Sequence, residues 1–136
     1  MTLPFNAFQA VIVSLLEDLK DLNSAVVPVH DEVPDKPTYP YVELGGYESE
    51  TDLSSDFLSY SVSWEINVYS KYAGSKEAND ILGQIAQRFK KIPTGLGFRS
   101  MSEGLTESIT VAKEVGSEDE LIRKAILRHK WRIYPI

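Results

Sequence analysis

The sequence contains no cysteine and only two histidines, His30 and His129. The lack of cysteine excludes disulfides, thiolate metal sites and cysteine nucleophiles, and two imidazoles leave little for a histidine-based metal site. No apolar run approaches 18 residues, so no membrane span is expected. The first residues lack the basic segment that begins a signal peptide. These absences predict a soluble protein, with no membrane partner, that is made in a cytoplasm.

Cations are scarce in the first part of the chain. The net charge is −6, from 14 basic and 20 acidic residues. Through Tyr60 there are two basic and eleven acidic residues, a balance of −9, whereas the remainder carries twelve basic and nine acidic residues, a balance of +3. The acidic balance argues against general nucleic-acid binding, which needs local positive charge. The asymmetry also allows an acidic face of one copy to meet a basic face of another.

Motifs that carry catalysis are missing as well. The sequence has no glycine-rich dinucleotide motif, no phosphate-binding loop, no zinc-protease motif and no nucleophile elbow. His129 lies among apolar residues of a predicted strand, which indicates a packed or hydrogen-bonded core histidine. The acidic residues between 48 and 56 do not have the spacing of a calcium-binding loop. The sequence therefore predicts no catalytic, cofactor-binding or metal-binding residue, and a protein that is not an enzyme.

The periodicity of apolar residues predicts two helices and five strands. The clearest signal lies between residues 58 and 68, where apolar residues alternate strictly with serine, glutamate and asparagine. Gly45-Gly46 indicates a bulge or bend, and Ser75 is a favourable helix N-cap before a helix that Pro93 stops. The predicted elements are a helix at 5–22, a strand at 26–33, a strand from 39 with the bulge, a loop at 48–56, a strand at 58–68, a helix from 75, a loop at 94–104, a strand at 105–115, a turn at 116–119 and a strand at 121–134.

Two amphipathic helices need a surface to cover, and several strands with one apolar face need to be covered. The predicted fold is an α+β two-layer sandwich in the order α-β-β-β-α-β-β, with a mostly antiparallel sheet and both helices on one face. No internal repeat or linker is visible, so residues 1–136 are expected to form a single domain.

Two charged sets are candidates for interaction surfaces. In the last strand, alternate cations point one way: Lys124, Arg128, Lys130 and Arg132. They either discourage edge aggregation or contact an acidic protein partner or a neighbouring copy. The second set is the acidic segment with Glu48, Glu50, Asp52 and Asp56, whose simplest interpretation is a solvated acidic loop.

Several segments together resemble the tail-completion family of tailed phages. The resemblance is carried by the run Val29-His30-Asp31-Glu32-Val33-Pro34, by the run from Tyr39 to Gly45, by the alternating strand from Tyr60 to Ser70, and by the helix that follows Gly74-Ser75-Lys76-Glu77-Ala78. These motifs are structural rather than catalytic, and the resemblance covers most of the chain. Members are tail terminators, also called tail-to-head joining proteins, of long non-contractile tails.

The resemblance implies a small α+β structural protein of the virion. Members form hexameric rings that cap the tail tube, stop its elongation and dock to the head connector. The implied partners are copies of the chain itself, the tail tube protein and the head connector protein, and the implied location is the head–tail junction after assembly in the host cytoplasm. A chain that is monomeric in isolation and assembles into the ring only on the end of the tail is compatible with this family resemblance. DNA passes through the lumen without specific binding, and the acidic set from Glu48 to Asp56 is the candidate channel lining.

Three alternatives remain open at the level of sequence. A head-completion or tail-tube component would keep the virion location but change the role. A small-molecule-binding α+β domain would use the sheet as its cradle. A hydrolase with an acid pair would need an activity that no motif predicts.

Overall fold

The computed structural model describes residues 3–54, 57–95, 97–116 and 120–136. Its two helices and seven strands follow one another along the chain as α1 (Phe5–Leu15), β1 (Val29–His30), β2 (Tyr41–Ser54), β3 (Phe57–Ser70), α2 (Lys76–Arg88), β4 (Thr94–Gly95), β5 (Phe98–Ser100), β6 (Leu105–Val115) and β7 (Leu121–Pro135). The class is therefore α+β, as predicted. Two short strands, β4 and β5, stand where the sequence predicts only a loop at 94–104.

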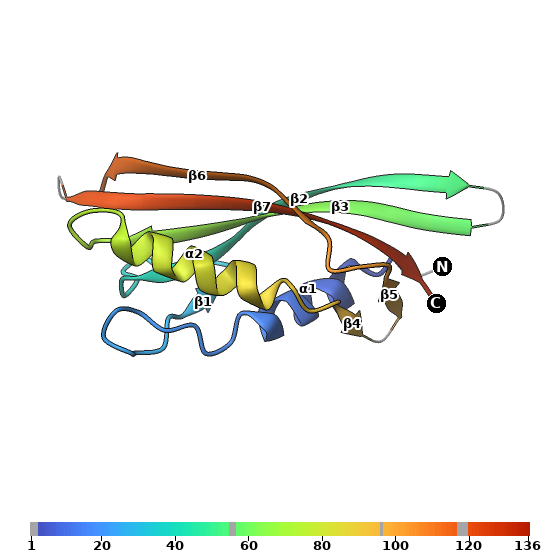
Figure 1. Ribbon diagram of the computed structural model, residues 1–136, viewed down its shortest axis with the longest axis horizontal. Coiled ribbons are helices and arrows are strands. Elements are labelled where there is room, and N and C mark those ends of the chain that lie inside the picture. The colour runs from blue at the N-terminus through green and yellow to red at the C-terminus, as the bar shows by residue number, and fades with distance from the viewer. Residues whose placement is uncertain (1–2, 55–56, 96, 117–119) are drawn as a thin grey trace.

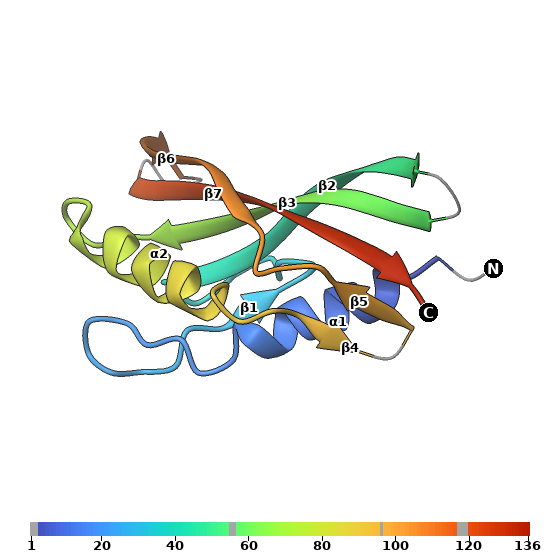
Figure 2. The same cartoon turned by 45° about the vertical axis from the view of Figure 1, so that its right-hand side comes forward.

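The seven strands form one mixed sheet. Its order is β1-β2-β3-β7-β5-β4, and β6 also pairs with β7. All pairings are antiparallel except that of β1 with β2, which is parallel. Figures 1 and 2 show a curled sheet with both helices on the same side of the long strands. We call this side of the sheet the inner face and the opposite side the outer face.

The core lies between the inner face and the helices. Val62, Trp64, Ile66 and Val68 of β3 are at most 2% exposed, as the strict alternation of that strand predicts. From β7, Ala125, Leu127, His129, Trp131 and Ile133 point to the same side and are buried. Phe8 of α1 lies among Trp64, Phe98 and Trp131, with ring centroids 5.2–6.0 Å apart and near-perpendicular rings. This edge-to-face packing joins α1 to both central strands.

Helix α1 is shorter than predicted. The apolar spacing predicts a helix to residue 22, but the helix ends at Leu15 and Asp18 has a φ of 62°. Leu16 and Leu19 are nevertheless fully buried, because the chain beyond the helix folds back with Lys20 and Val26 in a bridge. An apolar spacing that persists through a turn therefore extends the predicted helix beyond its true end.

The helix ends against a side chain from far along the sequence. Arg88 of α2 donates hydrogen bonds from Nη1 to the carbonyl oxygen of Leu15, at 3.2 Å, and to that of Glu17. Its Nη2 donates to the carbonyl oxygen of Asp18 at 3.3 Å. These carbonyls have lost their helical partners, so the guanidinium satisfies them and complements the negative end of the helix.

The predicted acidic loop at 48–56 is wrong over residues 48–54. These residues continue β2 and pair with β3, from Glu48 opposite Ser63 to Ser54 opposite Phe57. The segment is polar on both faces, so it lacks the alternation that marks a half-buried strand. The predicted strand at 26–33 is also wrong in length, since β1 contains two residues only.

Other local predictions are confirmed. The register shift between Leu44 and Tyr47 places a bulge at Gly45-Gly46. Ser75 is the N-cap residue of α2, but its side chain makes no cap, because its hydroxyl accepts a hydrogen bond from Arg123 Nη1 at 3.2 Å. Strands β6 and β7 match the predictions at 105–115 and 121–134 closely. Neither α1 nor α2 is long and apolar enough to cross a membrane.

Candidate interaction surface

The outer face of the sheet brings the two predicted charged sets together. Glu48, Glu50 and Asp52 lie opposite Ser63, Ser61 and Ser59 of β3, and Ser63 and Ser61 lie opposite Lys130 and Arg132 of β7. An acidic row, a serine row and a basic row therefore lie side by side. The fourth acidic candidate, Asp56, lies outside the described residues.

The small serine side chains let charges meet across the central strand. Arg132 Nη1 reaches Asp52 Oδ2 at 2.8 Å, although β3 lies between their strands. The two side chains are 46% and 45% exposed, so the pair contributes less than about 1 kcal/mol to stability. Charged groups at this exposure remain available to a partner.

The remaining candidate cations differ in their surroundings. Arg128 Nη2 lies 3.7 Å from Glu65 Oε1, and Lys124 Nζ lies 3.9 Å from Glu114 Oε1. Lys130 is exposed and has no ion-pair partner within the described part of the chain. The predicted basic set therefore shares one face, but three of its four members already neutralise acids of the same chain.

Sequence reasoning missed an aromatic row on the same face. Tyr41 and Tyr69 are opposed in β2 and β3 and stack with centroids 4.8 Å apart, and Tyr39 packs against Tyr41 at 5.1 Å. Lys124 Nζ lies 5.5 Å from the Tyr69 ring centroid, and Lys71 Nζ lies 4.4 Å from that of Tyr39. These are cation–π distances. The row depends on the pairing of β2 with β3, which the sequence alone does not specify.

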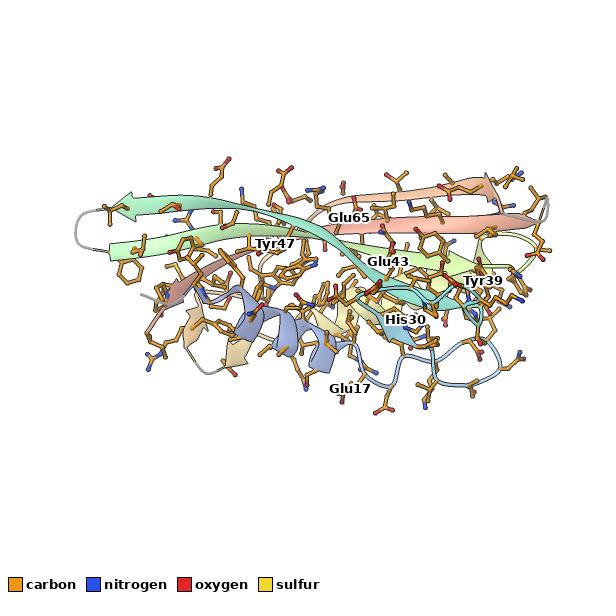
Figure 3. All side chains as sticks on the ribbon, turned by 180° about the vertical axis from the view of Figure 1, so that it is seen from behind. Glu17, His30, Tyr39, Glu43, Tyr47 and Glu65 are labelled. Carbon is orange, nitrogen blue, oxygen red and sulfur yellow. The ribbon has the colours of Figure 1, made fainter. Side chains whose placement is uncertain are left out.

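A carboxylate completes the aromatic row. Glu43 Oε1 accepts hydrogen bonds from Tyr69 OH at 3.3 Å and from Asn67 Nδ2 at 3.1 Å. Burial, followed by the charge of Glu43, raises the pKa of Tyr69 well above its ordinary value. Burial, followed by its two tyrosine neighbours, raises the pKa of Tyr41 in the same direction. Both phenols therefore stay protonated and act as neutral hydrogen-bonding groups. Figure 3 labels Glu43, Glu65 and Tyr39 on the molecule seen from behind.

His129 is the buried, hydrogen-bonded histidine that the sequence predicts. It is 4% exposed, with Nε2 2.8 Å from the carbonyl oxygen of Glu103 and Nδ1 3.1 Å from the Thr106 hydroxyl. A carbonyl can only accept, so Nε2 carries the proton and Nδ1 accepts from Thr106. Burial lowers the pKa of His129. The neutral ring ties the 103–106 segment to β7.

Clusters with the composition of a metal site are not found in the described ranges. No group of three or more histidine, aspartate or glutamate side chains is arranged there to hold a metal ion. The arrangement on the outer face instead combines partly exposed charges with a row of aromatic rings in which Tyr41 is 6% exposed. Such a surface is suited to recognising another macromolecule.

Comparison with known families identifies the class. A family model described as tail completion protein gp17 matches residues 9–102, which is more than half of the chain. The match defines a phage tail structural protein. The chain belongs to the tail completion protein gp17 family, which confirms the resemblance seen in the sequence.

A solved structure shares the fold over nearly the whole chain. The similar chain comes from the virion of a native gene transfer agent particle, with a TM-score of 0.74 and 16% sequence identity. The alignment covers 98% of this chain and 99% of that one. No curated protein matches the sequence significantly.

Proposed function

We propose that this protein caps the tail tube as a ring, ends tail elongation and joins the tail to the head connector. Membership of the tail completion family is the observation that carries the proposal. The shared fold with a chain of a gene transfer agent virion supports it. The proposed location is the head–tail junction of the virion, after assembly in the host cytoplasm, and six copies form the ring, as the family resemblance implies.

The charge of the outer face suits a surface near DNA. The four long strands place more acids than the four candidate cations on this face: Glu43, Glu48, Glu50, Asp52, Glu65, Glu107 and Glu114. A net acidic surface repels phosphates, so DNA passes a lumen lined by it without being held. This supports the role of Glu48, Glu50 and Asp52 in the channel lining.

The basic row supplies the second part of the proposal. Lys130 and Arg132 are the exposed members of the row and are suited to an acidic surface of the tube, the connector or a neighbouring copy. Reversing both charges in a Lys130→Glu, Arg132→Glu variant removes this attraction. Both side chains point to solvent, so we expect the fold to persist.

The experiment uses the phage or prophage that encodes the protein. Deleting the gene should yield unjoined heads and tails in negative-stain images, and the wild-type gene supplied in trans should restore joined particles. The charge-reversal variant should fold, as judged by circular dichroism, but restore few joined particles. Normal virions from the deletion would contradict the proposed function, whereas normal joining with the variant would contradict only the role of the basic row.

A further inference from the structure

The sheet has two long edges that are not covered by any other strand among the described residues. Beyond the two-residue pairing with β1, the part of β2 at 47–54, which we call the β2 arm, pairs with β3 alone among the described residues. Strand β6 likewise pairs with β7 alone among the described strands. Figure 1 shows the β2 arm at one end of the molecule and β6 toward the other. Each edge presents unpaired backbone N–H and C=O groups, to which another strand can add.

The geometry points to strand addition between copies, in which the β2 arm of one copy pairs with β6 of the next. The directions of the strands are compatible with this. Neighbouring strands alternate from β2 through β3 and β7 to β6, because these three pairings are antiparallel. A second copy in the same orientation therefore brings its β2 arm to β6 in the antiparallel sense, and the sheet continues from one copy to the next.

Exposed apolar residues indicate the register. On the inner face, the β2 arm carries Leu53, 69% exposed, and Tyr47, 41% exposed, while β6 carries Ile109, 54% exposed, and Val115, 68% exposed. The spacing is six residues in both strands. An antiparallel pairing that sets Leu53 opposite Ile109 therefore also sets Tyr47 opposite Val115. This register covers four apolar side chains that the single chain leaves partly exposed.

The same register brings one opposite-charge contact and one like-charge contact to the outer face, because it also sets Glu48 opposite Glu114, which lies near Lys124. It sets Glu50 opposite Ala112, and Ala112 is the partner of Lys124 in β7. The neighbour's Glu50 thus faces Lys124 across one small side chain. Within a single chain, Arg132 crosses the serine row to Asp52 in the same way, at 2.8 Å. Cations of β7 would therefore meet acids on both sides of the strand, Arg132 the Asp52 of its own chain across β3 and Lys124 the Glu50 of the next copy across β6.

Charge also indicates that the β2 arm pairs with β6 of another copy rather than with that copy's β2 arm. Two β2 arms would place Glu48, Glu50 and Asp52 of one copy against the same three acids of the other. On the outer face of β6 beyond its bulge, the residues are Ser108, Thr110, Ala112 and Glu114, and Glu114 is already near Lys124. Like charges directly opposite one another are destabilising. The β6 register has one such pair, Glu48 with Glu114, whereas two β2 arms would have three, so the β6 edge is favoured.

The test uses the natural absence of cysteine, because introduced thiols have no competitors in the same chain. The inference rests on the proposed ring. Opposed residues in an antiparallel pair have Cα atoms about 4.5–5.5 Å apart, within the range of a disulfide. A Leu53→Cys, Ile109→Cys variant of the full chain is supplied in trans to the deletion phage, and the purified particles are oxidised, because the isolated chain can stay monomeric. Strands β3 and β7 lie between the two positions in one chain, so the bond can form only between copies.

The expected result is a ladder of covalent oligomers that reducing agent removes, with peptide mapping that shows a disulfide between positions 53 and 109. The matched control is Leu53→Cys, Thr110→Cys, which moves one thiol to the outer face. Thiols on opposite faces point apart, so this control should give at most about one tenth of the cross-linked product of the Leu53→Cys, Ile109→Cys variant.

Three outcomes overturn the inference: a disulfide that joins position 53 to position 53, one that joins position 109 to position 109, or monomer alone. The proposed function has its own readout in the deletion phage. If tails of that phage still need the protein while no disulfide between positions 53 and 109 ever forms, the proposed function stands and the strand pairing fails.

Discussion

Strand β3 runs through two regions that differ in what holds them together. Where the helices cover the inner face, the residues of β3 that point to that face, from Val62 to Val68, are almost fully buried, and β3 lies between β2 and β7. Between Phe57 and Ser61 it pairs with residues 50–54 of the β2 arm, where Leu53 is 69% exposed and polar side chains occupy both faces. Backbone pairing with β2 is continuous in the second region, whereas in the first it is interrupted by the bulge at Gly45-Gly46. The comparison shows that burial stabilises the first region, whereas the second is kept as a strand by pairing and remains available to other molecules.

Breaking the buried region should have the largest effect on stability. Phe8 is fully buried and its ring contacts Trp64, Phe98 and Trp131. A Phe8→Ala substitution leaves a cavity among these rings and should lower the free energy of unfolding by about 3–5 kcal/mol in urea denaturation. The control is Leu53→Ala in the β2 arm, which should change it by less than about 0.5 kcal/mol. Equal losses in the two variants would contradict the distinction between the regions.

Removing the side chain that ends α1 should have an intermediate effect. An Arg88→Ala variant leaves the carbonyls of Leu15, Glu17 and Asp18 without their donor, at a cost of about 1–3 kcal/mol. Hydrogen exchange should become faster at the end of α1 and remain unchanged in the β2 arm. Arg88→Lys keeps the charge but loses the planar fork, so it should restore only part of the stability.

Acidification should act on the buried region through His129. Because burial holds its pKa below the ordinary value of 6.5, the unfolded chain binds the proton more readily than the folded chain. Stability should therefore be complete above about pH 6.5 and fall as the pH drops from there toward the lower folded-state pKa. Urea denaturation between about pH 5 and 8 measures this slope. His129→Gln should reduce the dependence of stability on pH in that window. An unchanged dependence would show that other titrating groups cause it.

The smallest effect is expected on the outer face. Asp52→Asn removes the exposed ion pair with Arg132 and should cost less than about 1 kcal/mol, with the difference decreasing at high salt. The same variant should also be assayed in the deletion phage. A larger effect on particle assembly than on the free energy of unfolding would show that the β2 arm serves assembly rather than stability. A loss of several kcal/mol would show that the β2 arm is part of the core instead.

The two regions also differ in how far the sequence predicts them. Val62, Trp64 and Ile66 alternate with polar residues because one side of β3 is buried, so the alternation in the sequence predicts the buried face. Residues 48–54 form a strand through backbone pairing with β3, which leaves no such pattern, so the sequence predicts a loop there. In the segment after α1, Leu16 and Leu19 continue the helical spacing while the backbone turns, because both are buried from a non-helical segment.

The candidate surface is predictable in its composition but not in its arrangement. The alternation of Arg128, Lys130 and Arg132 places these residues on one face of β7 from the sequence alone. That Asp52 meets Arg132, and that Tyr41 stacks on Tyr69, depends on which strands are neighbours. Strand order is a property of the whole chain and is not encoded in any short segment.

We propose that this chain completes the phage tail by offering surfaces rather than by catalysis. The most direct measurement is the distribution of tail lengths, by electron microscopy, for the phage with the gene deleted and with it restored in trans. The account predicts overlong tails of variable length in the deletion and a single length on restoration. A single normal length in both would contradict it.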